Sequence, residues 1–357
     1  MPERRFLLVR LGSMGDVIHA LPAASALRDT FPEARIDWAI EPRWARLLEG
    51  NRDLNEVIRV NRKSAGGIVA TVGTLRAAKY DCAIDFQALY KSALLARVAG
   101  ATRRVGFQSS YAREGLAAGL YTDRLNPRGA HKVDHNLTLA EFAGAHKAVP
   151  RFPMEISAAD EQAMASELAG RGIRVDDEDF FVLNPGGGWR SKCWPPERYG
   201  ALHRKLSECY GWRGVISFGP GEEDLARRVV EAAGSAAPIE APVETTSGAS
   251  IAAVSGSPVA VPLGLGPLMA LLRRAKFVVS ADTGPLHLAA ALGTRVVGLF
   301  GPTDPARNGP YRTGVVVRNP HNCETTYRRG EGDSPSMLSI TVEQVFAAVE
   351  RLLELPA

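Results

Sequence analysis

Short apolar segments alternate with helical segments along the first half of the chain, and this alternation constrains the fold more than any other feature. Each predicted strand is brief and apolar, and each is followed by a segment with helical character. The predicted strands span residues 6–9, 36–40, 57–60 and 82–85, and the predicted helices span residues 16–30, 44–49, 68–79 and 91–98. Such alternation predicts a parallel sheet with helices on both faces.

A second series of the same kind follows a change of character near residues 155–178. An amphipathic helix is predicted over residues 158–171, ahead of the acidic run at residues 176–179. Further strands are predicted over residues 180–184, 214–218, 277–280 and 296–300, and further helices over residues 197–210 and 222–233. The 357 residues, 45% of them hydrophobic, are enough for two domains with a core each. We predict an N-terminal domain at residues 1–165 and a C-terminal domain at residues 176–341.

Two segments lie outside this regular pattern. Residues 234–266 are rich in Ala, Ser, Gly and Pro, and we predict a loop with a short strand at residues 259–261. Such a long irregular segment is either functional or mobile. A last helix is predicted over residues 342–355, where apolar residues recur three or four positions apart, so one face of this helix requires a packing surface.

Composition narrows the functional classes. The formal net charge of +4 suits anionic ligands or membrane surfaces, and it equally suits a balanced solvated surface. The cysteines have no CxxC spacing, which favours a reducing compartment over a zinc site or a disulfide framework; they are Cys82, Cys193, Cys209 and Cys323. We recognise neither a signal peptide nor a run of roughly 20 apolar residues, so we expect a cytoplasmic protein.

The segment from Ser280 to Gly293 joins a buried strand to a helix through a tight turn. Pro285 suits the first helical position, and Gly293 suits the position just past the helix end. The amides at a helix N-terminus attract anions, and a carboxylate and a hydroxyl beside them suggest a diphosphate that carries a sugar. We therefore predict an anion site at this turn, where His287 could contact a phosphate or a ribose, the alternative being a half-buried structural histidine.

The loop from Asn184 to Glu197 follows the first predicted strand of the second domain. It contains three consecutive glycines, Gly186 to Gly188, and the cations Arg190 and Lys192. Glycine amides together with cations after a strand are suited to binding a diphosphate. The alternative is a flexible loop with solvated charges.

The loop from Leu11 to Asp16 directly follows the first predicted strand. Glu41 ends the next strand, where a dinucleotide-binding protein has the acidic residue that binds the ribose. The glycine spacing of the loop is not GxGxxG, however, so a dinucleotide site is poorly supported. Asp16 is interpreted either as a helix-capping acid or as a general base at the carboxyl end of a strand.

Glu222 lies in another turn after a strand, in the segment Phe218 to Asp224. Its carboxylate could accept hydrogen bonds from a ribose or a base, or it could merely complement the helix dipole. Several cations follow strands or turns in the first domain and could line an anionic acceptor site, or could be ordinary surface charges. They are Arg62, Lys63, Lys91, Arg103, Arg104 and Arg113.

With these motifs in place, the chain resembles glycosyltransferase family 9, the ADP-heptose:lipopolysaccharide heptosyltransferases. The motifs that carry the resemblance appear in the family's order and cover nearly the whole chain: Arg10 to Asp16, Asp85 to Ser92, Lys192 to Pro195, Ser280 to His287 and Gly301 to Pro305. The pairing of Asp37-Trp38 with Glu41, and the segment Tyr111 to Glu114, resemble the type I branch, which adds the first heptose to Kdo-lipid A.

The resemblance implies the GT-B architecture, with two Rossmann-like doubly wound parallel-sheet domains facing a cleft and the final helix, residues 342–357, packing back on the first domain. It implies inverting transfer from ADP-heptose to a lipid-linked inner-core acceptor, with domain closure excluding water. It implies no metal, no cofactor and no nucleic-acid partner, and peripheral contact with the cytoplasmic face of the inner membrane.

The resemblance also assigns roles to residues. Asp16 is the expected general base, and Lys192 is the expected contact to the diphosphate. The wider donor site is predicted at Gly187, Gly188, Lys192, Glu222, Leu263, Asp282, Thr283, Gly284 and His287. The acceptor site is predicted at Ser13, Met14, Gly15, Arg62, Lys63, Lys91 and Arg113.

The chain departs from the family pattern in two places. Gly186 to Gly188 stand where type I enzymes often have hydroxyl residues, so phosphate contacts there are expected from the backbone. The segment at residues 234–266 is longer than usual, so the sequence does not assign the residues of the adenine pocket beyond the candidate Leu263. The alternatives are a glycosyltransferase of the same fold with another donor or acceptor, a non-catalytic nucleotide-sugar-binding protein, and an NAD-dependent oxidoreductase, which the missing fingerprint disfavours.

Overall fold

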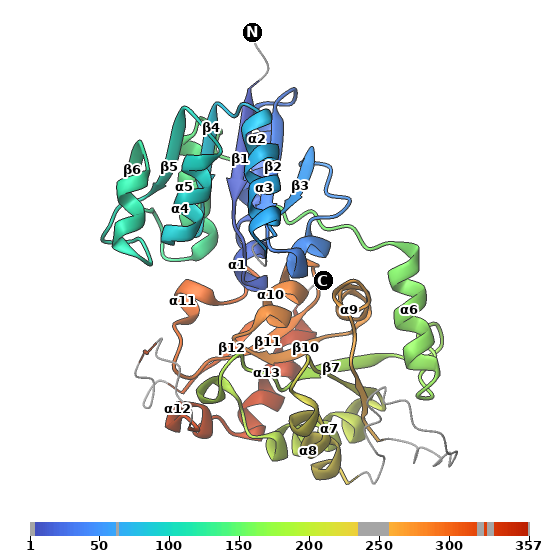
Figure 1. The fold of residues 1–357 in the computed structure, drawn as a ribbon. Helices are drawn as coiled ribbons and strands as arrows, with labels where there is room; N and C mark the ends of the chain where they lie inside the picture. Colours follow the sequence, from blue (N-terminus) through green and yellow to red (C-terminus); the bar gives the residue numbers. More distant parts are fainter. Residues whose placement is uncertain (1–3, 62–63, 235–256, 320–324, 327–331, 356–357) are drawn as a thin grey trace. The chain divides into compact units, whose positions relative to one another are not determined.

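The structure is a computed structural model that describes residues 4–61, 64–234, 257–319, 325–326 and 332–355 (Figure 1). The chain divides into two compact units, Met1–Glu155 and Ile156–Ala357. Each unit is built on one six-stranded sheet, and every strand pair whose register is defined is parallel. The predicted fold class, two parallel α/β sheets, is therefore confirmed.

The N-terminal sheet has the strand order β3-β2-β1-β4-β5-β6. Its strands are β1 (Arg5–Val9), β2 (Arg35–Ile40), β3 (Glu56–Arg59), β4 (Cys82–Asp85), β5 (Arg103–Phe107) and β6 (Asp123–Leu125). Strands β5 and β6 were not predicted, because β5 opens on two arginines and β6 is a three-residue edge strand without a fully buried residue. Chain order reverses between β1 and β4, which makes their carboxyl ends the switch point where ligands bind in such sheets.

Among the described residues of the N-terminal unit, the chain forms five helices and two 3₁₀ segments. They are α1 (Met14–Ile18), α2 (Leu21–Thr30), η1 (Pro42–Leu47), α3 (Ala65–Ala77), α4 (Tyr90–Val98), η2 (Gly115–Leu120) and α5 (Lys132–Phe142). The single helix predicted over residues 16–30 is two helices, because Pro22 lacks the amide that would continue the helical ladder and instead occupies the first turn of α2. Helix α5 was not predicted, and it packs against α2.

The C-terminal sheet has the strand order β12-β11-β10-β7-β8-β9. Its strands are β7 (Phe180–Asn184), β8 (Arg213–Ser217), β9 (Val259–Val261), β10 (Val278–Ala281), β11 (Val296–Leu299) and β12 (Val315–Val317). The short strand predicted at residues 259–261 is present, whereas β12 was not predicted. Here the switch point lies between β7 and β10, so the loops after these two strands share one edge of the sheet.

Eight helices and one 3₁₀ turn surround this sheet among the described residues. They are α6 (Ala158–Ala169), η3 (Arg190–Lys192), α7 (Pro196–Tyr210), α8 (Glu223–Ala232), α9 (Leu265–Arg274), α10 (Gly284–Ala291), α11 (Pro305–Asn308), α12 (Pro335–Leu338) and α13 (Val342–Glu354). Most of the segment predicted as a long loop, residues 235–256, lies outside the described residues, and α9 begins at its end.

The C-terminal helix belongs to the second unit, and the unit boundary differs from the prediction. Val345, Val349 and Leu352 of α13 are buried in the core of the C-terminal unit, where α13 packs against α7, β11 and β12. The apolar stripe of this helix is therefore covered within its own unit. Helix α6 likewise packs on α9 in the C-terminal unit, which moves the boundary from residue 165 to residue 155.

The central strands of both sheets are buried on both faces. Leu7, Leu8 and Val9 of β1 have no exposed surface, and neither do Val278 and Val279 of β10. Burying such a side chain stabilises the fold by about 1.5–3 kcal/mol. The polar residues that follow these strands are therefore attached to a well-packed sheet.

Among the described residues, no helix combines the length and the apolar character that crossing a membrane requires.

Candidate active site

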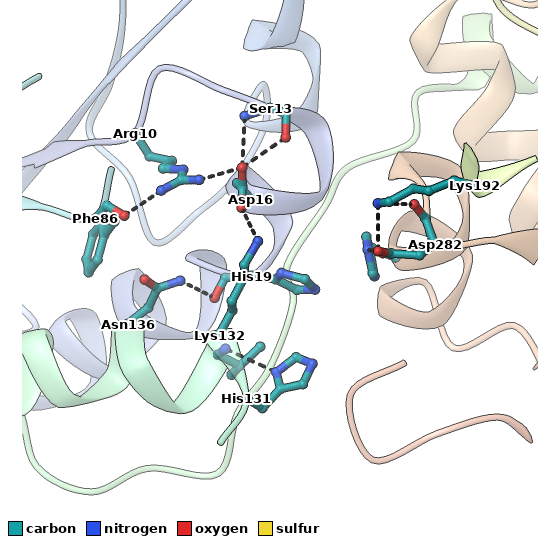
Figure 2. A network of polar contacts seen from close by, with 12 residues as sticks. Arg10, Ser13, Asp16, His19, Phe86, His131, Lys132, Asn136, Lys192 and Asp282 are labelled. Atoms are coloured by element: carbon teal, nitrogen blue, oxygen red, sulfur yellow. Dashed lines mark hydrogen bonds and ion pairs between the residues drawn. The ribbon is translucent and has the colours of Figure 1, made fainter. Parts of the chain in front are cut away.

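Asp16 lies in the first turn of α1, where the loop from β1 enters the helix. Arg10 Nη2 is 2.6 Å from Asp16 Oδ2, and Lys132 Nζ is 3.0 Å from Asp16 Oδ1. The Ser13 hydroxyl also donates to Oδ2, at 2.9 Å (Figure 2). The carboxylate is thus held by a cation on each oxygen, with one oxygen also engaged at the helix start.

Both interpretations of Asp16 have structural support. The Ser13 amide donates to Asp16 Oδ2 at 3.4 Å, so Oδ2 contributes to capping α1. Oδ1 accepts a hydrogen bond from the Lys132 ammonium, and the Lys132 side chain is 32% exposed. The oxygen that could receive a proton from a bound hydroxyl is therefore the one paired with the more exposed cation.

The electrostatics of the Asp16 site favour the ionised form. Burial raises the pKa of Asp16, but the positive charges of Arg10 and Lys132, with the hydrogen bond from Lys132, outweigh burial. Together they hold the pKa of this carboxyl well below its ordinary value. Asp16 is consequently an ionised carboxylate throughout the neutral range.

Arg10 is fixed by the loop that follows the neighbouring strand β4. Its Nη1 donates to the Phe86 carbonyl at 2.5 Å, and its own carbonyl accepts from Trp38 Nε1 at 3.1 Å. The adjacent Leu11 amide donates to Gln87 Oε1 at 2.8 Å. Because Arg10 is anchored at both its backbone and its guanidinium, it presents a fixed charge to Asp16.

The β4–α4 loop is in turn organised by a buried carboxyl, Asp85. Asp85 accepts hydrogen bonds from the Gln87 amide at 2.8 Å, the Ser92 hydroxyl at 2.7 Å and the Tyr121 hydroxyl at 2.7 Å. Burial raises the pKa of Asp85, and these hydrogen bonds oppose that rise. The motif from Asp85 to Ser92 therefore acts as a support for the loop that holds Arg10.

Helix α5 brings Lys132 and a histidine to the Asp16 site. His131 caps α5 by accepting from the Val133 amide at 3.1 Å, and its ring lies edge-on to that of His19, with centroids 5.1 Å apart. Asn136 of α5 donates to the His19 carbonyl at 2.9 Å, which ties α5 to the end of α1 (Figure 2). Arg10, His19, His131 and Lys132 were not predicted as site residues.

The predicted acceptor residues are only partly brought together. Met14 and Gly15 form the first turn of α1 with Asp16, and Ser13 precedes them. Lys91 is the second residue of α4, with Nζ 4.0 Å from Glu41 Oε1, and Arg113 is exposed in the loop after β5. All of these positions follow carboxyl ends of strands in the N-terminal sheet. Arg62 and Lys63 lie outside the described residues.

Arg103 and Arg104 do not belong to this edge of the sheet. They are the first residues of β5 and so lie at its amino end. Arg103 pairs with Asp123 at 3.6 Å, and Arg104 donates to the Leu120 carbonyl at 2.9 Å. The prediction that these two arginines could line an acceptor site is therefore wrong, because the direction of β5 places them at the opposite end of the sheet from Asp16.

In the C-terminal unit, Lys192 and Asp282 meet at the switch point between β7 and β10. Lys192 Nζ donates to Asp282 Oδ2 at 2.7 Å and to the Asp282 carbonyl at 2.9 Å (Figure 2). The Lys192 ammonium also lies 4.1 Å from the centroid of the Trp189 ring. On the other carboxylate oxygen, His287 Nε2 is 3.2 Å from Asp282 Oδ1. Three predicted donor residues thus form one buried cluster.

The turn before α10 is held by side chains from the neighbouring strand. The Thr283 hydroxyl is 3.0 Å from the Ser280 hydroxyl and donates to Asn184 Oδ1 at 3.4 Å. No side chain caps α10, and Pro285 has no amide, so the first turn offers the amides of Gly284 and Leu286. A fixed helix start of this kind attracts an anion.

The glycine loop after β7 is tightly packed at two of its three positions. A Cβ on Gly186 would lie 2.3 Å from Glu222 Oε1, and one on Gly187 would lie 2.5 Å from Cys193 Sγ. Glu222 Oε2 accepts from the Gly219 amide at 2.8 Å, so this carboxylate orders its own turn beside the loop. Gly188 has a φ of +70°, a conformation that favours glycine.

Leu263 is half-buried in the loop between β9 and α9. It therefore follows the carboxyl end of a strand in the same sheet as the Lys192–Asp282 cluster.

Among the described residues, no group of three or more His, Cys, Asp or Glu side chains has an arrangement suited to a metal ion.

The Asp282 cluster yields a prediction about acid stability. Burial raises the pKa of Asp282, but the hydrogen bond and charge of His287, and the charge and hydrogen bond of Lys192, hold it below the ordinary value of about 3.9. A depressed pKa stabilises the folded state above the unfolded pKa, and this contribution is lost as the pH falls towards the folded pKa. We expect Asp282→Asn to lower the free energy of unfolding more at about pH 7 than at about pH 3.

Urea denaturation at the two pH values measures this difference. Asp179→Asn is a suitable control, because Asp179 is 37% exposed and pairs with Lys276 at the surface of the same unit. Equal losses of stability for Asp282→Asn at both pH values would contradict the assignment.

Comparisons with known proteins agree with this architecture of two Rossmann-like sheets. Residues 68–333 match the model of glycosyltransferase family 9 (heptosyltransferase). Lipopolysaccharide heptosyltransferase 3 of Escherichia coli K12 is 26% identical over 347 residues, which cover 95% of each chain. Lipopolysaccharide heptosyltransferase 1 of Pseudomonas aeruginosa is 31% identical over 319 residues, which cover 86% of this chain and 81% of the relative.

The solved structure of E. coli heptosyltransferase WaaC with ADP is 27% identical, with a TM-score of 0.72, and the match covers 98% of this chain and 99% of that one. The chain therefore has the GT-B fold of glycosyltransferases. It belongs to glycosyltransferase family 9 and is a heptosyltransferase.

Proposed function

We propose that this heptosyltransferase transfers heptose from ADP-heptose to the inner core of lipopolysaccharide, on an acceptor of the Kdo-lipid A type. The observation that carries the proposal is the Asp16 carboxylate, ionised at a switch point and flanked by Arg10 and Lys132. A carboxylate base surrounded by cations suits an acceptor that is both a nucleophilic alcohol and an acid. The relatives include type 1 and type 3 enzymes, and the similarity around Glu41 and Tyr111 favours type I.

The Lys192–Asp282 cluster supports a donor site in the C-terminal unit. Its ammonium lies beside the start of α10, so a diphosphate there would meet both a cation and backbone amides. The similar E. coli enzyme has been solved with ADP and with ADP-2-deoxy-2-fluoro heptose. In this proposal Gly187, Gly188 and Thr283 contact the diphosphate, while Glu222 and Leu263 contact the nucleoside.

The reaction that we propose is a single inverting displacement. The acceptor hydroxyl oxygen forms a bond to the anomeric carbon as the bond from that carbon to the ADP oxygen breaks. Asp16 accepts the hydroxyl proton, a general-base contribution worth about 10²–10⁴-fold in rate. Lys192 and the α10 amides stabilise the negative charge that develops on the ADP leaving group.

Lys132 gives this scheme a role for the acceptor's own charge. Arg10 is anchored to the Phe86 carbonyl, whereas the Lys132 side chain is 32% exposed. An acidic acceptor would draw the Lys132 ammonium away from Asp16 Oδ1 and place its hydroxyl there instead. Losing that cation raises the basicity of Asp16 when the acceptor is bound.

The test is a transfer assay with purified protein, ADP-heptose and Kdo-lipid A, which follows ADP release and the mass of the glycolipid. We expect one heptose to be added, and no turnover with NAD. A protein that adds heptose only to an already heptosylated core would refute the type I assignment. Binding of ADP-heptose without any transfer would instead identify a non-catalytic nucleotide-sugar-binding protein.

The acceptor that we propose is membrane-embedded, so the enzyme should act as a peripheral protein at the cytoplasmic face of the inner membrane. Its other substrate, the nucleotide sugar, is water-soluble. The reaction as proposed uses no metal and no cofactor.

A further inference from the structure

Four large apolar or aromatic side chains are exposed where α4 meets η2 in the N-terminal unit. Leu116 is 82% exposed, Tyr111 is 54%, Tyr90 is 48% and Leu94 is 40%. We call these residues, together with the exposed cations Lys91, Arg97 and Arg113, the α4–η2 surface. Exposed apolar side chains are ordinary when scattered singly, but a group of them marks an interaction site.

Hydrogen bonds hold the members of the α4–η2 surface together. The Tyr90 amide donates to Glu114 Oε2 at 2.6 Å, and the Glu114 amide donates to the Ala88 carbonyl at 3.2 Å. Leu116 lies two residues beyond Glu114 in the chain, at the start of η2. Behind the surface, Ala93 of α4 packs on Ala117 and Ala118 of η2. The two segments therefore form one rigid support.

Helix geometry adds a stripe to the same surface. Tyr90, Leu94 and Arg97 are four and three residues apart, so they follow one face of α4. Tyr111 is fixed by its amide, which donates to the Gln108 carbonyl at 2.9 Å, and by the His135 ring, whose centroid is 6.4 Å away. Apolar and aromatic side chains are thus presented with cations interspersed.

The charge of the surface selects its partner. Three exposed cations, Lys91, Arg97 and Arg113, face one carboxylate of the surface, Glu114, which accepts from the Tyr90 amide. Lys91 also lies 4.0 Å from Glu41 Oε1, so the surface keeps an excess of positive charge through Arg97 and Arg113. A second copy of the same surface would bring cations against cations. An anionic bilayer instead accepts the cations at its headgroups and the leucine and tyrosine side chains at the acyl boundary.

We propose that the α4–η2 surface docks this enzyme on an anionic lipid bilayer. This inference rests on the proposed function, because a lipid-linked acceptor must be met at a membrane. Helix α4 begins directly after β4, the strand beside β1, so its first residues lie at the same edge of the sheet as Asp16. Docking there would bring Asp16, the proposed general base, to the headgroup region.

Flotation of the full-length protein with vesicles tests the surface. The vesicles contain phosphatidylethanolamine and phosphatidylglycerol, and pure phosphatidylcholine vesicles are the uncharged comparison. We expect wild-type protein to bind the anionic vesicles, and Tyr111→Ser/Leu116→Ser to bind them roughly tenfold or more weakly, because two inserted side chains are lost. Val149→Ser is the matched control, since Val149 is 84% exposed and lies outside the surface.

Two further measurements separate the possible failures. Unchanged thermal melting and ADP affinity show that the double variant is folded, and sedimentation velocity reports its oligomeric state. Equal vesicle binding by the wild type and the double variant overturns the proposal. The proposal is also overturned if the wild type is a dimer and the double variant is a monomer, because a second copy would then cover the surface. Transfer to vesicle-embedded acceptor should fall in the double variant, while transfer to a delipidated acceptor should not. Vesicle binding without any transfer would refute the proposed function and leave the docking surface standing.

Discussion

Replacing Asp16 with asparagine should lower heptosyl transfer by about 10²–10⁴-fold while leaving ADP affinity unchanged. The amide cannot take the acceptor proton, but it keeps the shape of the side chain and an oxygen for the Ser13 hydroxyl, which donates to Asp16 at 2.9 Å. Steady-state transfer assays measure the first effect, and titration calorimetry with ADP measures the second. Near-normal turnover in this variant would remove Asp16 from the base role.

The Asp16 variant needs a check on folding. Arg10 is buried and would lose its anionic partner, and breaking a buried ion pair commonly costs about 3–5 kcal/mol. Thermal melting must therefore show a folded protein at the assay temperature. Asp224→Asn is the matched control, because Asp224 also lies in the first turn of a helix and pairs with an arginine, Arg227, but it is 72% exposed. This control should retain full activity.

Replacing Lys192 with alanine should weaken ADP binding and also lower the rate of transfer. The ammonium would be lost from a site where the leaving group gains charge, and removal of one such contact costs ~2.7–4 kcal/mol, or about 10²–10³-fold in kcat. Calorimetry with ADP and single-turnover assays with ADP-heptose separate the two effects. If both ADP affinity and rate were unchanged, Lys192 would not belong to the donor site.

Lys276→Ala provides a matched control for the lysine. Lys276 pairs with Asp179 at 2.9 Å and lies 5.8 Å from the Trp212 ring centroid, so it repeats the chemical setting of Lys192 in the same unit. Its side chain is 41% exposed, however, whereas that of Lys192 is 10% exposed. We expect the control to bind ADP and to turn over normally, since an exposed pair contributes little.

The alternating apolar segments predicted most of both sheets, because buried parallel strands are short apolar runs with few other interpretations. Strands over residues 82–85 and 180–184 were predicted to the residue. Strands β5 and β6 were not predicted, because neither is an apolar run in the sequence. Strand β5 begins with two arginines, and β6 has no fully buried residue. The apolar stripe of the final helix predicts that the helix is covered but does not predict which surface covers it, and in the structure the core of the C-terminal unit covers that stripe.

The residues of the Lys192–Asp282 cluster were predicted more completely than those around Asp16. Lys192, Asp282 and His287 stand in two recognisable turns after strands, and the sheet order brings those turns together. The cations of Asp16 were missed for different reasons. The sequence indicates Arg10 only as part of the motif from Arg10 to Asp16. Lys132 stands on α5, whose apolar positions Val133, Leu139 and Ala140 are buried but do not by themselves predict a helix.

The sequence by itself determined the class of fold, the family and the turns in which we propose the chemistry, since each depends on short-range spacing of residue types. Only the tertiary structure decided that Asp16 is held between Arg10 and Lys132, which are 6 and 116 residues away in the chain. It also separated Arg103 and Arg104 from that carboxylate. The physical reason is that charge interactions depend on distance in space, which strand order and direction set, and not on distance along the chain.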